Sequence, residues 1–237
     1  MCDERLWQSV WPQLKAQYQK PLQLVHLSIP TTGTMDEVVA AMATKITADE
    51  AILVGFSLGG YLASAIALLI PDRIEHLVVI ANMLKNLPDA EIKQRKRIML
   101  SLANARYSGI ANKRIDNLLH PEIRTFQNHT YVEQIKATIA QMDADLGGDV
   151  LLHQLKVSIS RPSLLQPLAT SNIPTTFLVG DADTFVELPA LVQEIQETDS
   201  AENISVIKIV NTGHMLPLES PQVLTSALIN ILQHSSE

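Results

Sequence analysis

The chain has 237 residues, of which 46% are hydrophobic and 18% are charged, and this length suits one large domain or a core with an insertion. Its net charge of −7 argues against a nucleic-acid partner, because proteins that bind nucleic acids usually carry a basic excess. The single cysteine, Cys2, excludes an internal disulfide, and the polar N-terminus lacks a secretion signal, so we expect a cytoplasmic protein.

Short apolar runs alternate with helical patterns toward both ends of the chain. The predicted strands are residues 22–27, 51–54, 77–81, 176–179 and 204–210, and the predicted helices around them are residues 35–46, 61–69 and 223–232. Continuous apolar strands that alternate with helices predict an α/β fold with a mostly parallel sheet covered by helices on both faces.

The middle of the chain has a different pattern. Four polar helical segments are expected there, at residues 89–106, 110–119, 131–142 and 150–158, with no strand between them. We therefore expect a helical cap, residues 83–170, inserted between two halves of one core, residues 1–82 and residues 171–237. Apolar and aromatic residues of this cap are expected to roof a pocket: Met99, Leu100, Leu102, Tyr107, Ile110, Phe126 and Tyr131.

Basic residues gather in the same middle region of an acidic chain. They are Lys93, Arg95, Lys96 and Arg97, followed by Arg106, Lys113 and Arg114. Such a cluster is most often a solvated helix face, and in this chain it could also steer an anionic substrate or an acidic carrier protein.

Residues 51–70 contain no charged residue over a length that would span a bilayer. Within this stretch, Gly55, Phe56, Ser57, Leu58 and Gly59 fit the pattern G-x-S-x-G, with a predicted strand before it and a predicted helix after it. That context is typical of a nucleophile elbow, in which a strained turn exposes a serine at the sheet edge. Side chains at positions 55 and 59 are expected to collide across the turn, and the Leu58 N–H is expected to face a developing oxyanion.

A serine hydroxyl needs a base, normally a histidine that a carboxylate orients. Two later predicted strands run directly into Gly180-Asp181-Ala182-Asp183 and into Thr212-Gly213-His214. Ser57, an aspartate and His214 would then meet at one sheet edge, in the chain order of α/β-hydrolases. Asp181 and Asp183 both remain candidates at this point.

These motifs make the chain resemble the α/β-hydrolase superfamily, in particular its small esterases and lactonases. The resemblance is carried by GFSLGG, IPTTFLVGDAD and GHMLPLESP, and it extends over nearly the whole chain. It implies that Ser57 is the nucleophile, that His214 is the general base and then acid, and that Asp183 rather than Asp181 orients His214. It also implies that no metal or organic cofactor is required.

The beginning of the chain departs from that family pattern. Residues 1–14 resemble the segment just after the turn that supplies the second oxyanion donor, so the strand before that turn is not seen. Three outcomes are open: the natural chain begins upstream, the strands at 22–27 and 51–54 pair directly, or the fold is loosened, with Met1 or Cys2 amides as donors. We favour the first, and expect the chain as written to be a weak enzyme.

The function expected from these features is hydrolysis of a carboxylic ester or thioester through an acyl-enzyme on Ser57. The substrate is expected to be a small molecule, with an anionic or carrier-bound acyl group left open, and neither nucleic acid nor membrane is expected as a partner. Two alternatives remain. One is a lactonase, C–C bond hydrolase or lyase that uses the same triad, and the other is a non-catalytic ligand-binding homologue.

Overall fold

The computed structural model describes residues 1–104 and 107–234, and its core is a sheet of four parallel strands in the order β1-β2-β3-β4. The strands are β1 (Ala51–Phe56), β2 (Ile74–Ile80), β3 (Thr175–Gly180) and β4 (Ile204–Ile209). Four of the five predicted strands are therefore present, and the predicted α/β class with a mostly parallel sheet is confirmed.

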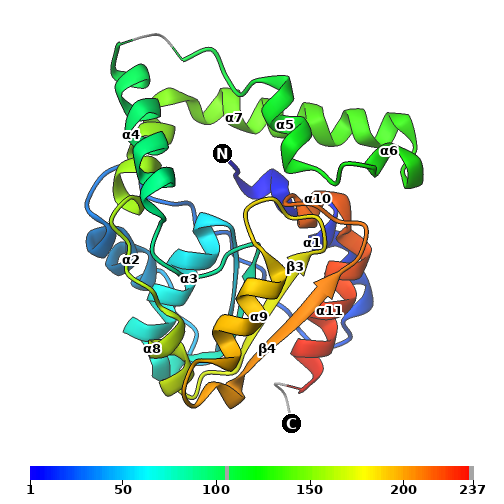
Figure 1. Ribbon diagram of the computed structural model, residues 1–237. Helices are drawn as coiled ribbons and strands as arrows, with labels where there is room; N and C mark the ends of the chain where they lie inside the picture. The colour runs from blue at the N-terminus through cyan, green and yellow to red at the C-terminus, as the bar shows by residue number, and fades with distance from the viewer. Residues whose placement is uncertain (105–106, 235–237) are drawn as a thin grey trace.

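Helices cover both faces of this sheet (Figure 1). In β2, Leu77 and Val79 pack into one apolar cluster, while Val78 and Ile80 pack into the other. The first cluster takes in α2 (Met35–Ala43), α3 (Leu58–Leu69), α8 (Leu165–Thr170) and α9 (Leu188–Gln196), and the second takes in α1 (Val10–Gln17) and α11 (Pro221–His234). Burial on both faces explains why the central strands have no polar alternation.

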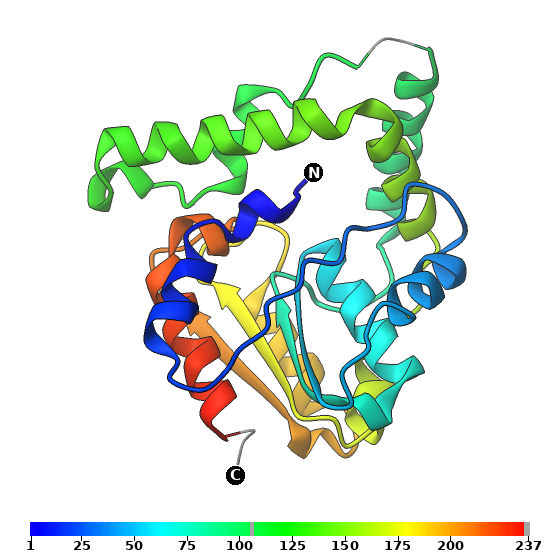
Figure 2. The ribbon, with the colours of Figure 1, turned by 180° about the vertical axis from the view of Figure 1, so that it is seen from behind.

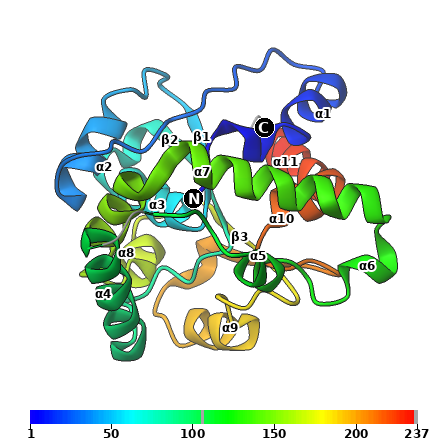
Figure 3. The same cartoon turned by 90° about the horizontal axis from the view of Figure 1, so that it is seen from above.

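The middle of the chain forms helices that lie beyond the carboxyl ends of the strands (Figures 1 and 2). They are α4 (Asp89–Asn104), α5 (Asn112–Leu118), α6 (Ile123–Phe126) and α7 (His129–Ser158), and α10 (Leu216–Glu219) lies below them in the core. Viewed from above, α7 crosses over the sheet (Figure 3). Arg106, which ends one predicted helix and belongs to the predicted basic cluster, lies outside the described residues.

Helix α7 contains both helices predicted for residues 131–142 and 150–158. They are joined across a kink at Gly147, whose φ of 75° and ψ of 176° are not helical. A positive φ is readily adopted only by glycine, which explains why the helical direction changes at this residue.

The strand predicted at residues 22–27 is wrong. This segment has no strand conformation, although Leu22 and Leu24 pack against one apolar cluster and Leu27 packs against the other. Among the described residues, β1 pairs with β2 alone, so direct pairing of segment 22–27 with β1 is also contradicted. The apolar run correctly indicated that these leucines pack against the core, but a strand also needs a neighbour to complete its hydrogen-bond ladder.

Residues 51–70 are divided between β1 and the 12-residue helix α3, separated by Ser57. Seven of the α3 residues are buried, which accounts for the lack of charge in this stretch. In the described part of the chain, the search for a helix with the length and apolar character of a membrane span finds none.

Candidate active site

Ser57 occupies the sharp turn between β1 and α3, with a φ of 53° and a ψ of −119°. This conformation is costly for a residue with a side chain, so its surroundings must hold it in place. The Ser57 N–H donates to the Ile80 carbonyl at 2.8 Å, and the Ser57 carbonyl accepts from the Asn82 side-chain amide at 2.8 Å. The Asn82 Oδ1 atom accepts a hydrogen bond from the Leu84 N–H at 2.7 Å. Sequence reasoning missed Asn82, because no motif marks it.

The two glycines of the elbow have different roles. A Cβ at Gly55 would lie 2.3 Å from the Gly59 carbonyl oxygen, so the turn requires glycine at position 55 as predicted. A Cβ at Gly59 would meet no atom within 4 Å beyond its chain neighbours and the backbone of its own helix, and the predicted collision at position 59 is therefore wrong. Gly59 lies in the first turn of α3, and its backbone makes the close approach to Gly55.

The three residues predicted to act together are in contact. The His214 Nε2 atom lies 3.3 Å from the Ser57 Oγ, and the His214 Nδ1 lies 3.0 and 3.1 Å from the two Asp183 carboxylate oxygens. Asp183 and His214 are buried, with 9% and 6% of their surface exposed. With a proton on Nδ1 donated to Asp183, the Nε2 lone pair faces the serine hydroxyl.

The structure separates the two candidate aspartates. The Asp183 Oδ1 atom also accepts from the Phe185 N–H at 2.8 Å, which fixes the carboxylate toward His214. Asp181 is exposed, and its Oδ1 accepts from the Thr212 N–H at 3.1 Å. Asp181 therefore braces the loop that leads to His214, and it is Asp183 that contacts the histidine.

Glu219 is a buried carboxyl beneath the His214 loop, and the sequence motifs assigned it no role, although it lies within GHMLPLESP. Its carboxylate accepts from the N–H groups of Gly213 at 3.1 Å and Met215 at 3.0 Å, the two neighbours of His214. It also accepts from the His120 N–H at 2.7 Å, in the segment between α5 and α6. Burial raises its pKa to about 7, although the three N–H donors act in the opposite direction.

The Leu58 N–H, which directly follows Ser57 in the chain, is the backbone donor predicted for the oxyanion. Leu58 is the first residue of α3, and the first N–H groups of a helix have no carbonyl partner within it. The positive end of the helix dipole adds to the effect, so negative charge that develops beside Ser57 would be stabilised there.

Residues that were predicted to form an apolar roof over a pocket instead take part in polar contacts with Asp143. The Tyr107 hydroxyl and the Ile110 N–H donate to the buried Asp143 carboxylate at 2.5 and 2.8 Å, and the Met1 ammonium lies 3.3 Å from the same residue. Of the seven residues predicted to roof a pocket, Tyr131 alone lines either of the two cavities described.

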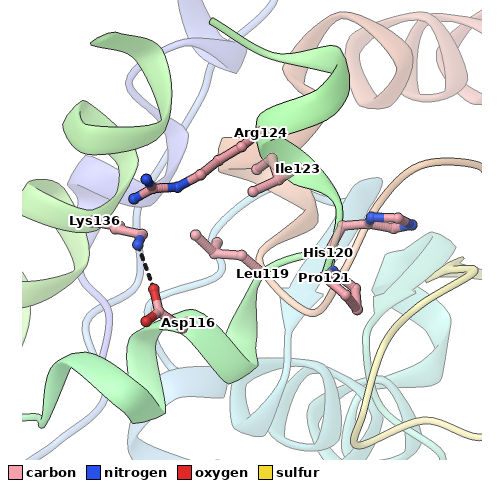
Figure 4. Close-up of a pocket in the computed structure, with 7 residues that line it drawn as sticks. All are labelled: Asp116, Leu119, His120, Pro121, Ile123, Arg124 and Lys136. Atoms are coloured by element: carbon pink, nitrogen blue, oxygen red, sulfur yellow. Dashed lines mark ion pairs between the residues drawn. The ribbon is translucent and has the colours of Figure 1, made fainter. Parts of the chain in front are cut away.

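The larger of these cavities, about 210 Å³, lies among the helices of the middle segment (Figure 4). Ser57, Asp183 and His214 do not line it. Its lining residues are Asp116, Leu119, His120, Pro121, Ile123, Arg124 and Lys136, with an ion pair between Lys136 and Asp116. His120 is the link to the site, because its N–H is bound by Glu219.

Comparison with known proteins places this geometry in context. A family model described as the alpha/beta hydrolase family matches residues 20–227 of this chain. No curated protein sequence matches significantly.

Solved structures with the same fold cover most of the chain. A thermophilic esterase from Thermogutta terrifontis superposes with a TM-score of 0.78 and 21% identity, over 98% of this chain and 86% of its own. A bromoperoxidase from Bacillus anthracis superposes with a TM-score of 0.73 and 20% identity, over 98% and 88%. A thioesterase domain from the curacin biosynthetic pathway gives 0.62 and 20%, over 96% and 87%. At these identities the likeness establishes the fold.

Proposed function

Because the chain belongs to the alpha/beta hydrolase family, we propose that it is a serine hydrolase that cleaves a carboxylic ester or thioester through an acyl-enzyme on Ser57. One observation carries this proposal: the continuous hydrogen-bonded chain from the Ser57 hydroxyl through His214 to Asp183. A serine in a strained turn at a helix N-terminus has no need of a buried histidine–aspartate pair for folding alone.

The geometry supports a two-step reaction. His214 Nε2 takes the Ser57 proton while Oγ attacks the carbonyl carbon, and the Leu58 N–H stabilises the oxyanion. Protonated His214 then gives its proton to the leaving alcohol or thiol, which departs and leaves the acyl group on Ser57. Water, deprotonated by His214, attacks this acyl group, and protonated His214 returns the proton to the Ser57 Oγ as the acid leaves. Asp183 keeps the imidazole in the productive tautomer and stabilises its charged form.

The esterase and the thioesterase domain among the structural neighbours support this class of reaction and leave the leaving group open. The esterase was solved with malate bound, so a related fold accommodates a small dicarboxylate. The same triad also serves a lactonase, a C–C hydrolase or a lyase, and the products distinguish these reactions.

A fluorophosphonate probe tests the proposal directly, because it labels only an activated serine. We expect the wild-type chain to be labelled and to hydrolyse members of a panel of p-nitrophenyl esters and acyl thioesters. Ser57→Ala should abolish labelling and lower hydrolysis at least about 10³-fold. Ser226→Ala, on the exposed side of α11, is the matched control. A folded wild-type chain that neither labels nor hydrolyses would instead support a non-catalytic ligand-binding homologue.

A further inference from the structure

Helix α5 of the cap is docked on the two loops that carry Asp183 and His214. The His214 N–H donates to the Leu118 carbonyl at 2.8 Å, at the last residue of α5. The Thr184 hydroxyl, next to Asp183, donates to the Asn117 carbonyl at 3.2 Å. A side chain one turn earlier on α5 is therefore held at a defined position relative to the site.

That side chain is Arg114. Its guanidinium carbon lies 5.7 Å from the centre of the Phe185 ring, within the range of a cation–π contact. The Phe185 ring centre lies in turn 4.7 Å from the centre of the His214 imidazole. Phe185 is 47% exposed although it contacts a buried histidine, so it lies where the site opens to solvent.

The exposed Arg114 guanidinium is accessible to an anionic ligand. Among the described residues no carboxylate forms an ion pair with Arg114, whereas Asp116 on the same helix is paired with Lys136. Arg114 thus places an exposed positive charge beside Phe185, which itself contacts His214, in an acidic protein.

We propose that Arg114 selects substrates that carry a second, anionic group, a carboxylate or phosphate a few atoms from the scissile carbonyl. This inference rests on the proposed function, and it names the substrate class of the same site. The fork of a guanidinium binds either anion in a bidentate manner, while Phe185 contacts the intervening carbon chain. Because the ion pair between Arg114 and the anionic group would be partly exposed to solvent, we expect an effect on selectivity of about 3- to 10-fold.

The test compares esters that differ only in one charge. For a charge on the acyl side, mono-p-nitrophenyl glutarate is compared with p-nitrophenyl valerate. For a charge on the alcohol side, 4-carboxyphenyl butyrate is compared with phenyl butyrate. An ester that carries a phosphate group distinguishes selection of phosphate from selection of carboxylate. We expect one anionic member to have the higher kcat/KM relative to its neutral partner, and Arg114→Gln to remove that preference. Arg114→Lys should keep part of it. Lys113→Gln, which removes an adjacent exposed charge, should leave it unchanged.

A second measurement keeps the inference separate from the proposed reaction. Glutarate should raise the melting temperature of wild type and Lys113→Gln, with a smaller shift in Arg114→Gln. If neutral esters are hydrolysed but the anionic-to-neutral ratio is the same in wild type and Arg114→Gln, the selection is disproved and the hydrolase proposal stands. If no ester is hydrolysed but the glutarate shift depends on Arg114, the reaction is disproved and anion binding stands. If kcat/KM in Arg114→Gln falls by the same factor for the anionic and the neutral ester, the inference is also contradicted.

Discussion

The Glu219 carboxylate accepts a hydrogen bond of 2.7 Å from the His120 N–H, and this contact ties the segment between α5 and α6 to the loop that carries His214. The same carboxylate binds the N–H groups on both sides of His214. Three backbone donors from two parts of the chain therefore depend on one buried side chain. This arrangement leads to two predictions about stability.

Replacement of Glu219 by alanine leaves these three N–H groups without their acceptor. We expect a loss of about 3–5 kcal/mol in the free energy of unfolding at pH 6, since each unpaired buried donor costs about 1–3 kcal/mol and the site relaxes in part. Thermal unfolding followed by circular dichroism measures the change. Glu202→Ala, at an exposed glutamate, is the control. Equal melting temperatures for the two variants would show that the three bonds contribute little.

The raised pKa of Glu219 predicts a pH dependence of stability. In the folded state this carboxyl titrates at about 7, against an ordinary value of 4.5, so between these values the folded chain holds a proton that the unfolded chain has released. Stability from this group is complete below pH 4.5 and is lost as the pH rises through 7, with a total of at most about 3 kcal/mol. Glu219→Gln should flatten the profile in this window, whereas Glu202→Gln should preserve it. Parallel profiles for wild type and Glu219→Gln would refute the assignment.

The contact of Asp183 with His214 predicts different effects for the two neighbouring aspartates. Asp183→Asn removes the acceptor that holds the Nδ1 proton, and we expect kcat to fall by about 10²–10⁴-fold with KM little changed. Asp181→Asn keeps an oxygen for the Thr212 N–H and should retain activity within about threefold, because that bond is partly exposed. Steady-state kinetics on one p-nitrophenyl ester compares them. A larger loss in Asp181→Asn would reverse the assignment.

The elbow predicts opposite effects for its two glycines. Gly55→Ala places a methyl group 2.3 Å from the Gly59 carbonyl oxygen, which neither backbone can avoid, and we expect a destabilisation of about 3 kcal/mol or more. Gly59→Ala meets no atom within 4 Å inside a helix and should stabilise the chain by about 0.5–1 kcal/mol. Denaturant unfolding of both variants gives the comparison. The packing argument fails if the two alanines have effects of the same sign and size.

Much of the site could be predicted from sequence because its parts are local. Ser57 lies in a G-x-S-x-G turn, and the strand before this turn and the helix after it can both be predicted from the adjacent residues. Asp183 and His214 each follow a predicted strand, and the carboxyl ends of parallel strands meet at one edge of a sheet. Asn82 and Glu219 were not given roles, because no local motif marks them and each binds a backbone group of a distant segment, Ser57 for Asn82 and His120 for Glu219.

The amino-acid sequence by itself determined the α/β class, the helical middle of the chain and the order of the three contacting residues, since periodicity and turn chemistry are properties of neighbouring residues. The tertiary structure alone decided that segment 22–27 is not a strand, that Gly59 has room for a side chain, and that Arg114 lies over Phe185 beside His214. Each of these depends on which remote segment lies opposite. Strand pairing, steric room and ring contacts are relations between surfaces, and only packing brings those surfaces together.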